Sequence, residues 1–284
     1  MPNVPYHLAR LEGKTVRCLY RAALPLIVRR KPAITREIAL EMFTYSGEDT
    51  LPEQIASIRS FLVCVGRPKS ITVLSDGSHS SAGIRLLEQV DPSVRVCQSL
   101  PILPANLSEQ VRTYLTTHPT GKQLALIMSL PKNGPALYVD SDVRFFPGAS
   151  DLIRITRTEG VSAFYLADYQ FSGDDRLLID PMEKRNPANT GFLLVLRKLD
   201  WSLALQRLIE LKGPPVFFTN QTVVHLCMHA NGAVPFDPLR YILRVDDEFV
   251  YGDQFASPAV TMRHYVHQIR HKFWTSCARR LRLD

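Results

Sequence analysis

The sequence predicts an α/β domain whose central sheet is mostly parallel and is flanked by helices. Short apolar runs typical of buried strands alternate with segments of helical periodicity after residue 36. Hydrophobic residues make up 45% of the 284-residue chain, which is enough for one sizeable core. The five cysteines are scattered without a C-x-x-C pair, so neither a disulfide framework nor a structural zinc site is expected.

Near-continuous apolar runs of four to six residues predict the strands, because the strands of a parallel sheet are buried on both faces. These runs are Glu41–Tyr45, Ser70–Leu74, Val94–Cys97, Ala136–Val139, Ser162–Leu166 and Gly191–Leu196. Apolar residues three or four positions apart predict the helices. The expected helices are Leu51–Val65, Ala82–Val90, Leu107–Thr117, Lys122–Leu130, Trp201–Leu211 and Asn220–Met228. This alternation implies right-handed crossovers between parallel strands.

The domain is expected to span residues 37–284, after an N-terminal extension or packed helical leader over residues 1–36. Four prolines are scattered through that leader among short apolar and basic patches. The tail from Asp246 to Trp274 shows weak periodicity, so we expect it to fold over the edge of the sheet rather than to extend it.

The formal net charge of +7 and the pI near 9.2 suggest an anionic partner such as a nucleotide, a phosphate or an acidic membrane surface. Nucleic acid has no support beyond charge. The stretch from Arg263 to Arg282 is basic, and the last six residues of the chain are expected to be a solvated face, although Arg279, Arg280 and Arg282 could hold the protein at an anionic membrane. No run of about 20 apolar residues is present, so a cytoplasmic protein is expected, either free or peripheral to a membrane.

Two carboxylates follow the apolar run Ala136–Val139 directly, in the sequence Asp140-Ser141-Asp142. Open α/β sheets bind ligands at the carboxyl ends of their strands. Residues i and i+2 of an extended segment point to the same side, so both acids could ligate one hard divalent cation. The alternative is a solvated turn, because Asp and Ser are ordinary turn residues.

Around these acids the sequence resembles the GT-A glycosyltransferases, most closely the family that contains glycogenin and bacterial lipopolysaccharide galactosyltransferases. The resemblance covers residues 39–275. Its ordered pieces are Lys122, Tyr138-Val139-Asp140-Ser141-Asp142, Ala167-Asp168, Asn189-Thr190-Gly191-Phe192, Asn220-Gln221, Arg263-His264-Tyr265-Val266 and Arg270-His271-Lys272-Phe273-Trp274. It implies a Rossmann-like GT-A fold with the C-terminal tail over the active site, and transfer of a sugar from a nucleoside diphosphate sugar, such as a UDP-sugar, to an unknown acceptor. Transfer is expected to retain the anomeric configuration.

The resemblance also implies a divalent metal, Mn²⁺ or Mg²⁺, that bridges the diphosphate oxygens. Such a metal neutralises the charge that builds on the leaving diphosphate. Asp142 would ligate the metal directly, Asp140 would reach it through water or would contact the ribose, and His264 would be the third protein ligand. On local grounds His264 could equally be a surface histidine of a basic tail.

Basic residues would supplement the metal at the diphosphate. Lys122 is expected there, together with Arg270 or Lys272 and with Trp274, which would close over the phosphates. The spacing in this chain departs from the family pattern, and Phe273 replaces the usual proline. Whether Arg270 or Lys272 meets the diphosphate is therefore open.

For the donor sugar, the resemblance assigns Asp168 and Asn189 to the hydroxyl groups and Gln221 to a position beneath the reacting carbon. Asn189 could instead cap a turn, and Gln221 could be an ordinary first-turn helix residue. Family members usually carry Asp before this glutamine, where the present chain has Asn220.

Polar residues at the ends of the first two strands are candidates for the nucleotide by position. They are Thr44, Tyr45 and Ser46 at the end of the first strand and Asp76 after the second. Tyr45 could stack on the base, whereas Ser75-Asp76-Gly77 could be a plain turn.

Two other functions are compatible with the residues. A catalytically idle GT-A-like module would bind a nucleotide or a protein partner without turnover. A phosphotransferase of the haloacid dehalogenase type also carries D-x-D, but Arg144 replaces the Thr or Val of its motif and the acids come too late in the strand order. The acids Asp246, Asp247 and Glu248 are expected to be solvated, or else to assist an acceptor hydroxyl.

Overall fold

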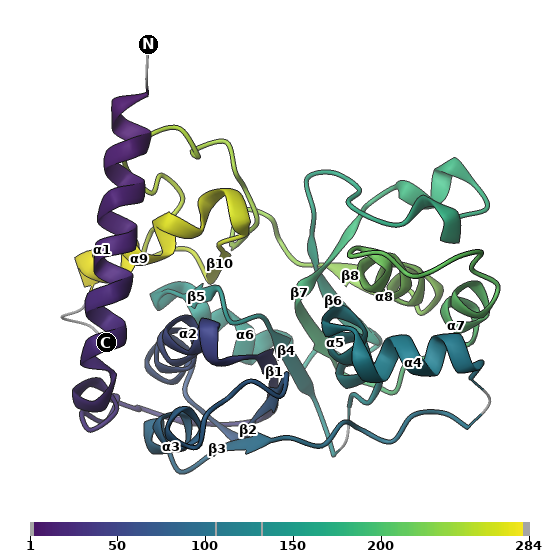
Figure 1. Cartoon of the computed structure of the whole chain (residues 1–284), viewed down its shortest axis with the longest axis horizontal. Helices are drawn as coiled ribbons and strands as arrows, with labels where there is room; N and C mark the ends of the chain where they lie inside the picture. The colour runs from purple at the N-terminus through teal and green to yellow at the C-terminus, as the bar shows by residue number, and fades with distance from the viewer. Residues whose placement is uncertain (1–2, 106, 132, 281–284) are drawn as a thin grey trace.

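A seven-stranded sheet forms the centre of the computed structural model, which describes residues 3–105, 107–131 and 133–280 (Figure 1). In spatial order its strands are β3 (Val94–Cys97), β2 (Arg67–Ser75), β1 (Glu37–Ser46), β4 (Ala136–Val139), β7 (Ala188–Val195), β6 (Ala163–Ala167) and β8 (Val234–Pro235). Only β7 runs antiparallel to its neighbours, β4 and β6. The predicted α/β class with a mostly parallel sheet is confirmed.

Side chains of successive strand residues enter two separate hydrophobic clusters, as the pleat of a strand requires. In β1, Met42 belongs to one cluster and Phe43 to the other, and Leu137 and Tyr138 of β4 divide in the same way. The first cluster includes residues of α2 (Leu51–Cys64), α3 (Ser81–Val90) and α6 (Asp151–Ile155). The second includes α4 (Glu109–Thr117), α5 (Pro119–Met128), α7 (Ser202–Ile209) and α8 (Thr219–Ala230). Helices therefore cover both faces of the sheet.

The C-terminal tail contributes one strand to a second, three-stranded sheet and then forms a helix. The sheet contains β5 (Val143–Phe145), β10 (Met262–His264) and β9 (Tyr241–Ile242), and the helix is α9 (Arg270–Arg280). The tail thus leaves the main sheet unextended, as predicted, but its weak periodicity concealed β10 and α9. In β10, which has three residues, the side chains are all buried, so neither alternation nor length marked it as a strand.

Five short 3₁₀ turns complete the described elements. They are η1 (Glu48–Thr50), η2 (Pro147–Ser150), η3 (Asp175–Leu177), η4 (Pro181–Lys184) and η5 (His267–Ile269). The last of them connects β10 to α9, so it carries the chain away from His264 toward the N-terminal helix.

The N-terminal segment contains the 24-residue helix α1 (Val4–Ile27), which lies along the edge of the molecule against α9 (Figure 1). The two helices approach closely at Gly13, where an added Cβ would come within 2.5 Å of the His271 carbonyl oxygen. The rings of Tyr20 and Trp274 also pack together, with centroids 5.1 Å apart. None of the helices in the described ranges is long and apolar enough to cross a bilayer.

A buried ion-pair cluster anchors the tail. Asp247 is fully buried and binds the Arg263 guanidinium at 2.7 Å, and Asp253 also pairs with Arg263. The expectation that Asp247 is solvated is therefore wrong, because Arg263 of β10 and Lys272 of α9 enclose it. Its neighbour Asp246 is exposed and pairs with Arg244.

Candidate active site

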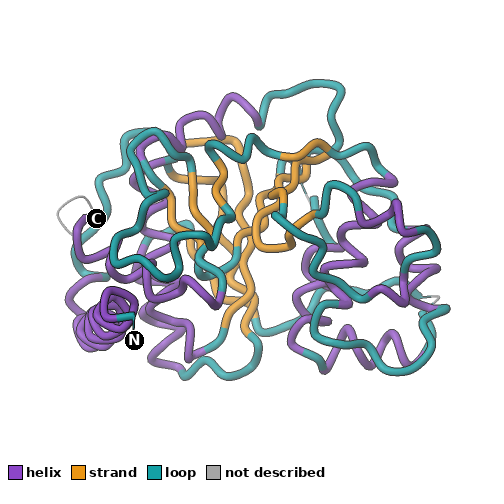
Figure 2. Tube along the Cα trace, turned by 90° about the horizontal axis from the view of Figure 1, so that it is seen from above, coloured by secondary structure: helices purple, strands orange, loops and turns teal. Residues whose placement is uncertain are grey.

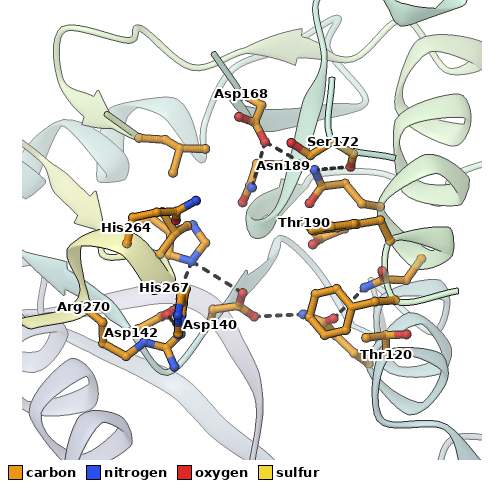
Figure 3. A pocket seen from close by; sticks show the side chains of 18 of the residues that line it. Thr120, Asp140, Asp142, Asp168, Ser172, Asn189, Thr190, His264, His267 and Arg270 are labelled. Atoms are coloured by element: carbon orange, nitrogen blue, oxygen red, sulfur yellow. Dashed lines mark hydrogen bonds and ion pairs between the residues drawn. The ribbon is translucent and has the colours of Figure 1, made fainter. Parts of the chain in front are cut away.

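Strand pairing brings Asp140, Asp142 and His264 together. The two acids follow β4, and β10 runs antiparallel to β5 with His264 opposite Val143. The Tyr265 amide also donates a hydrogen bond to the Asp142 carbonyl oxygen at 3.0 Å, which fixes this register. His264 Nε2 consequently lies 3.1 Å from Asp142 Oδ1 and 3.7 Å from Asp140 Oδ2 (Figure 3).

Gly191 of β7 lies directly beneath the His264 ring. A Cβ at this glycine would come within 2.2 Å of His264 Cε1, so the site requires a residue without a side chain here. The Gly191 carbonyl oxygen accepts a hydrogen bond from the Asp140 amide at 2.9 Å. Gly191 therefore positions both His264 and Asp140.

The donor set suits a hard divalent cation. One oxygen from each carboxylate and one imidazole nitrogen lie within 4.8 Å of one another, and Asp142 and His264 are buried. Carboxylates favour Mg²⁺ and Mn²⁺, and imidazole is accepted by first-row metals. His264 Nε2 faces both carboxylates, whereas the buried Nδ1 has no hydrogen-bond partner. The three residues fit the predicted metal.

Positive groups balance the two acids electrostatically. Arg270, the first residue of α9, pairs with the Asp142 carboxylate. Burial alone would raise the pKa of Asp142, but His264 and Arg270 outweigh it and lower this pKa to about 2. Burial and the neighbouring Asp142 raise the pKa of Asp140 instead. Asp142 is thus the acid held in its charged, ligating form.

A chain of side-chain hydrogen bonds holds Asp140 from the opposite side. Tyr138 donates its hydroxyl to Asp140 Oδ1 at 2.7 Å, and Gln123 Nε2 donates to the same oxygen at 2.9 Å. Asn220 Nδ2 in turn donates to Gln123 Oε1 at 2.7 Å. Because the Asn220 amide donates, the Gln123 amide presents its own donor to Asp140. Asn220, which stands where an aspartate was expected, therefore has Gln123 as its hydrogen-bond partner.

Amide side chains gather around Asp168 at the other end of the cavity. Asn189 and Gln221 donate hydrogen bonds to Asp168 Oδ2 at 3.2 and 3.3 Å, and Gln221 also reaches the Ser172 carbonyl oxygen at 2.8 Å. Burial raises the pKa of Asp168. The structure thus joins three residues that the sequence singled out separately for the donor sugar.

These groups line one cavity of about 290 Å³ (Figure 3). Asp140, Asp142, His264 and Arg270 occupy one end of it, and the Asp168 cluster faces them. Four apolar side chains complete its mostly polar wall: Phe217, Phe218, Leu243 and Val266. Such a cavity is typical of a site for a small molecule.

The structure places Lys272 and Trp274 away from this cavity. Lys272 is fully buried and donates to the carbonyl oxygens of Val250 and Gly252 at 2.8 and 2.7 Å. Trp274 is also buried and donates its indole N–H to Glu53 at 3.0 Å. Of the two basic candidates for the diphosphate, only Arg270 lines the cavity.

The nucleotide candidates form a separate group at the ends of β1 and β2, outside the cavity lining. Thr44 is buried and donates to Gln54 at 2.7 Å. Lys122 Nζ donates to the Asp76 carbonyl oxygen at 3.0 Å, so these two residues do lie together. Burial and the nearby Asp76 carboxylate raise the pKa of Tyr45 to about 12.

Several lining or supporting residues were missed by the sequence analysis. Gln123 and Tyr138 support Asp140, while His267 and Gln268 line the cavity between β10 and α9. Tyr138 had a usable signal, because it stands two residues before Asp140 on an extended strand and so shares its side. Gln123 had no such signal, since a glutamine is a common residue at any polar position of an amphipathic helix.

Comparison with solved structures identifies the architecture. The chain superposes on mouse xyloside xylosyltransferase 1 with a TM-score of 0.51 at 12% identity, covering 82% of this chain and 99% of that one. It superposes on the galactosyltransferase LgtC, solved with donor and acceptor sugar analogs, with a TM-score of 0.54 at 12% identity, covering 84% and 95%. The chain has a GT-A glycosyltransferase fold.

The GT-A fold is shared with a third structure, the bifunctional glycosyltransferase WbbM, at a TM-score of 0.55 and 12% identity. That match covers 84% of this chain and 47% of the larger protein. The sequence matches no protein-family model and no curated protein. At such low identity the relation lies in the fold, so the function must be argued from the site.

Proposed function

We propose that the protein is a metal-dependent glycosyltransferase that transfers a sugar from a nucleoside diphosphate sugar, of the UDP-sugar type, to an acceptor. The observation that carries this proposal is the Asp140–Asp142–His264 cluster, placed at the end of β4 beside Arg270. Asp142, His264 and Asp140 would hold Mn²⁺ or Mg²⁺. The metal would act as a Lewis acid on the diphosphate leaving group.

Arg270 would supply a second positive charge to the diphosphate. Its guanidinium already faces Asp142 and is half-exposed to the cavity, so it can reach an anion without crossing a packed core. A planar guanidinium can form two parallel hydrogen bonds with phosphate oxygens. Lys122, Tyr45, Thr44 and Asp76, which lie at or beside the ends of β1 and β2, would bind the nucleotide moiety.

Asp168, Asn189 and Gln221 would bind the transferred sugar. Their network offers both donors and acceptors, which hydroxyl-rich ligands require. Asp168 is the one described carboxylate of the cavity outside the metal cluster, and it already accepts hydrogen bonds from two amides. Its other oxygen accepts the Tyr169 amide, so this carboxylate is occupied in positioning and no free carboxylate of the described lining remains for an acceptor hydroxyl, which favours a retaining rather than an inverting outcome.

The test is a screen of nucleotide sugars for Mn²⁺-dependent hydrolysis or transfer, with the anomeric configuration of the product read by NMR. We expect turnover that EDTA abolishes and that Mn²⁺ restores. Asp142→Asn should lower it by at least about 10³-fold, because the metal loses its charged ligand. Asp175→Asn removes a carboxylate that is exposed and lies outside the cavity, so it is the matched control.

The possible results separate the alternatives. Undiminished turnover in Asp142→Asn would remove the metal assignment. Mn²⁺-dependent binding of a nucleoside diphosphate with no hydrolysis or transfer of any sugar would favour an idle GT-A-like binding module. An inverted product would overturn the retaining assignment while leaving the metal site intact.

A further inference from the structure

Helix α1 carries an apolar face that no other described part of the chain covers. Five large apolar side chains on it are between 52% and 68% exposed: Val4, Leu8, Leu11, Leu19 and Leu26. At 3.6 residues per turn they fall within an arc of about 100° of the helix surface, together with the exposed Cys18 and Ala22. Apart from the exposed Thr15 in the same arc, this is one apolar stripe rather than a scatter of single residues.

The stripe points away from the protein, except that Leu11 also borders a cavity between α1 and the tail. The residues of α1 that are buried, Ala9, Gly13, Tyr20 and Leu24, occupy the other side of the helix and pack against the body of the molecule. Viewed along its axis, α1 stands at the outer edge of the molecule (Figure 2). The protein itself thus uses one face of α1 and leaves the opposite apolar face to solvent.

Basic residues run beside the apolar stripe. Arg10, Lys14, Arg17 and Arg21 follow one another at helical spacing, and three further exposed basic residues come directly after the helix, Arg29, Arg30 and Lys31. The segment 10–31 contains one acid, Glu12, against these seven basic residues, of which Arg17 is already paired with the buried Glu53. An apolar face bordered by Lys and Arg is typical of a helix that lies in the interface of a membrane.

We propose that α1 docks the protein on an anionic lipid bilayer. The apolar stripe would insert to the boundary between head groups and acyl chains, and the basic residues would lie among the head groups. Charge decides between this occupant and a second copy of the chain. Two copies that met through this face would bring the same basic residues together, whereas anionic lipids neutralise them.

Docking through α1 would also bring the candidate active site near the bilayer. Arg10, Lys14 and Arg17 line a second cavity, of about 520 Å³, between α1 and the tail. His267, Gln268 and Arg270 line both this cavity and the candidate active site. The surface proposed here is distinct from the basic C-terminal end: Arg282 lies outside the described residues, as do the side chains of Arg279 and Arg280.

Vesicle sedimentation of the full chain tests the proposal. We expect the protein to sediment with vesicles of phosphatidylcholine and phosphatidylglycerol at low salt, but not with phosphatidylcholine alone. Each basic residue near an anionic membrane surface raises the vesicle partition coefficient about fivefold. The basic-stripe variant, Arg10→Gln/Lys14→Gln/Arg21→Gln, should therefore bind about 100-fold more weakly. Its matched control loses the same charge from exposed positions elsewhere: Arg157→Gln/Arg197→Gln/Lys198→Gln.

The apolar face is tested by Leu8→Ser/Leu11→Ser/Leu19→Ser, which should weaken binding at least tenfold. All three side chains are exposed, and circular dichroism verifies that the variant remains folded. Equal binding of wild type and the basic-stripe variant, or an equal loss in the matched control, would overturn the proposal. So would a wild-type chain that ignores vesicles but dimerises in light scattering through a contact abolished by the leucine variant.

Discussion

Replacing Gly191 with alanine should disable the metal site without unfolding the domain. The new Cβ would lie 2.2 Å from His264 Cε1, whereas ordinary contact begins near 3.4 Å, so the ring must retreat by about 1.2 Å. Overpacking of this kind costs about 1–3 kcal/mol of stability. Displacement of a group in an active site by about 1 Å can cost about 100-fold in rate, and we expect a loss of this order.

The assay compares Mn²⁺ affinity, by isothermal titration, with Mn²⁺-dependent turnover in wild type and Gly191→Ala. Gly252→Ala is the matched control, because nothing lies within 4 Å of the Cβ that it adds. If the glycine acts through His264, Gly191→Ala should cost nothing further in a His264→Ala background. Unchanged affinity in Gly191→Ala, or full additivity with His264→Ala, would refute the reasoning.

Three further predictions concern other groups. Arg270→Gln should tighten Mn²⁺ binding severalfold, since it removes a competing cation, yet raise KM for the donor about 10-fold or more. If the variant bound both Mn²⁺ and the donor more tightly, or both more weakly, the role of Arg270 at the diphosphate would be contradicted. Asn220→Asp replaces the donor to Gln123 with an acceptor, so the Gln123 amide should turn over and no longer donate to Asp140, and turnover should fall about 10-fold. A Gln123→Leu background should abolish that effect. Asp91→Asn should cost about 2 kcal/mol at pH 7, because the buried carboxylate accepts two hydrogen bonds from Arg67. Hydrogen bonds from Arg67 and Ser93 lower the folded-state pKa of Asp91 despite burial, so the stabilisation by this carboxylate is present above the unfolded pKa near 4 and is lost as the pH falls further. Urea unfolding of wild type and Asp91→Asn should converge toward pH 3, and a constant difference would contradict the ion pair.

The sequence by itself determined the α/β class and the position of the acid pair. Strands buried on both faces leave continuous apolar runs, and polar residues directly after such a run must emerge at the edge of a sheet. Asp140 and Asp142 could therefore be located from Ala136–Val139 alone. Asp168 and Asn189 flank neighbouring strands, so their meeting was also within reach of the sequence.

Only the tertiary structure decided which parts of the tail reach the site. His264 arrives there through the pairing of β10 with β5, a contact between segments more than 100 residues apart that local periodicity does not encode. Arg270 and Lys272 stand two residues apart at the start of one helix, where that spacing separates side chains by about 200°. Arg270 consequently faces Asp142, whereas Lys272 is enclosed with Asp247.

The outward apolar face of α1 was likewise invisible before the fold was known. Apolar residues occur on both sides of this helix, so the sequence alone did not tell which side packs against the protein. Packing of Gly13 and Tyr20 against α9 settles that choice. The sequence thus determines what each segment can become through short-range patterns, whereas long-range packing decides which of its faces meets solvent, metal or substrate.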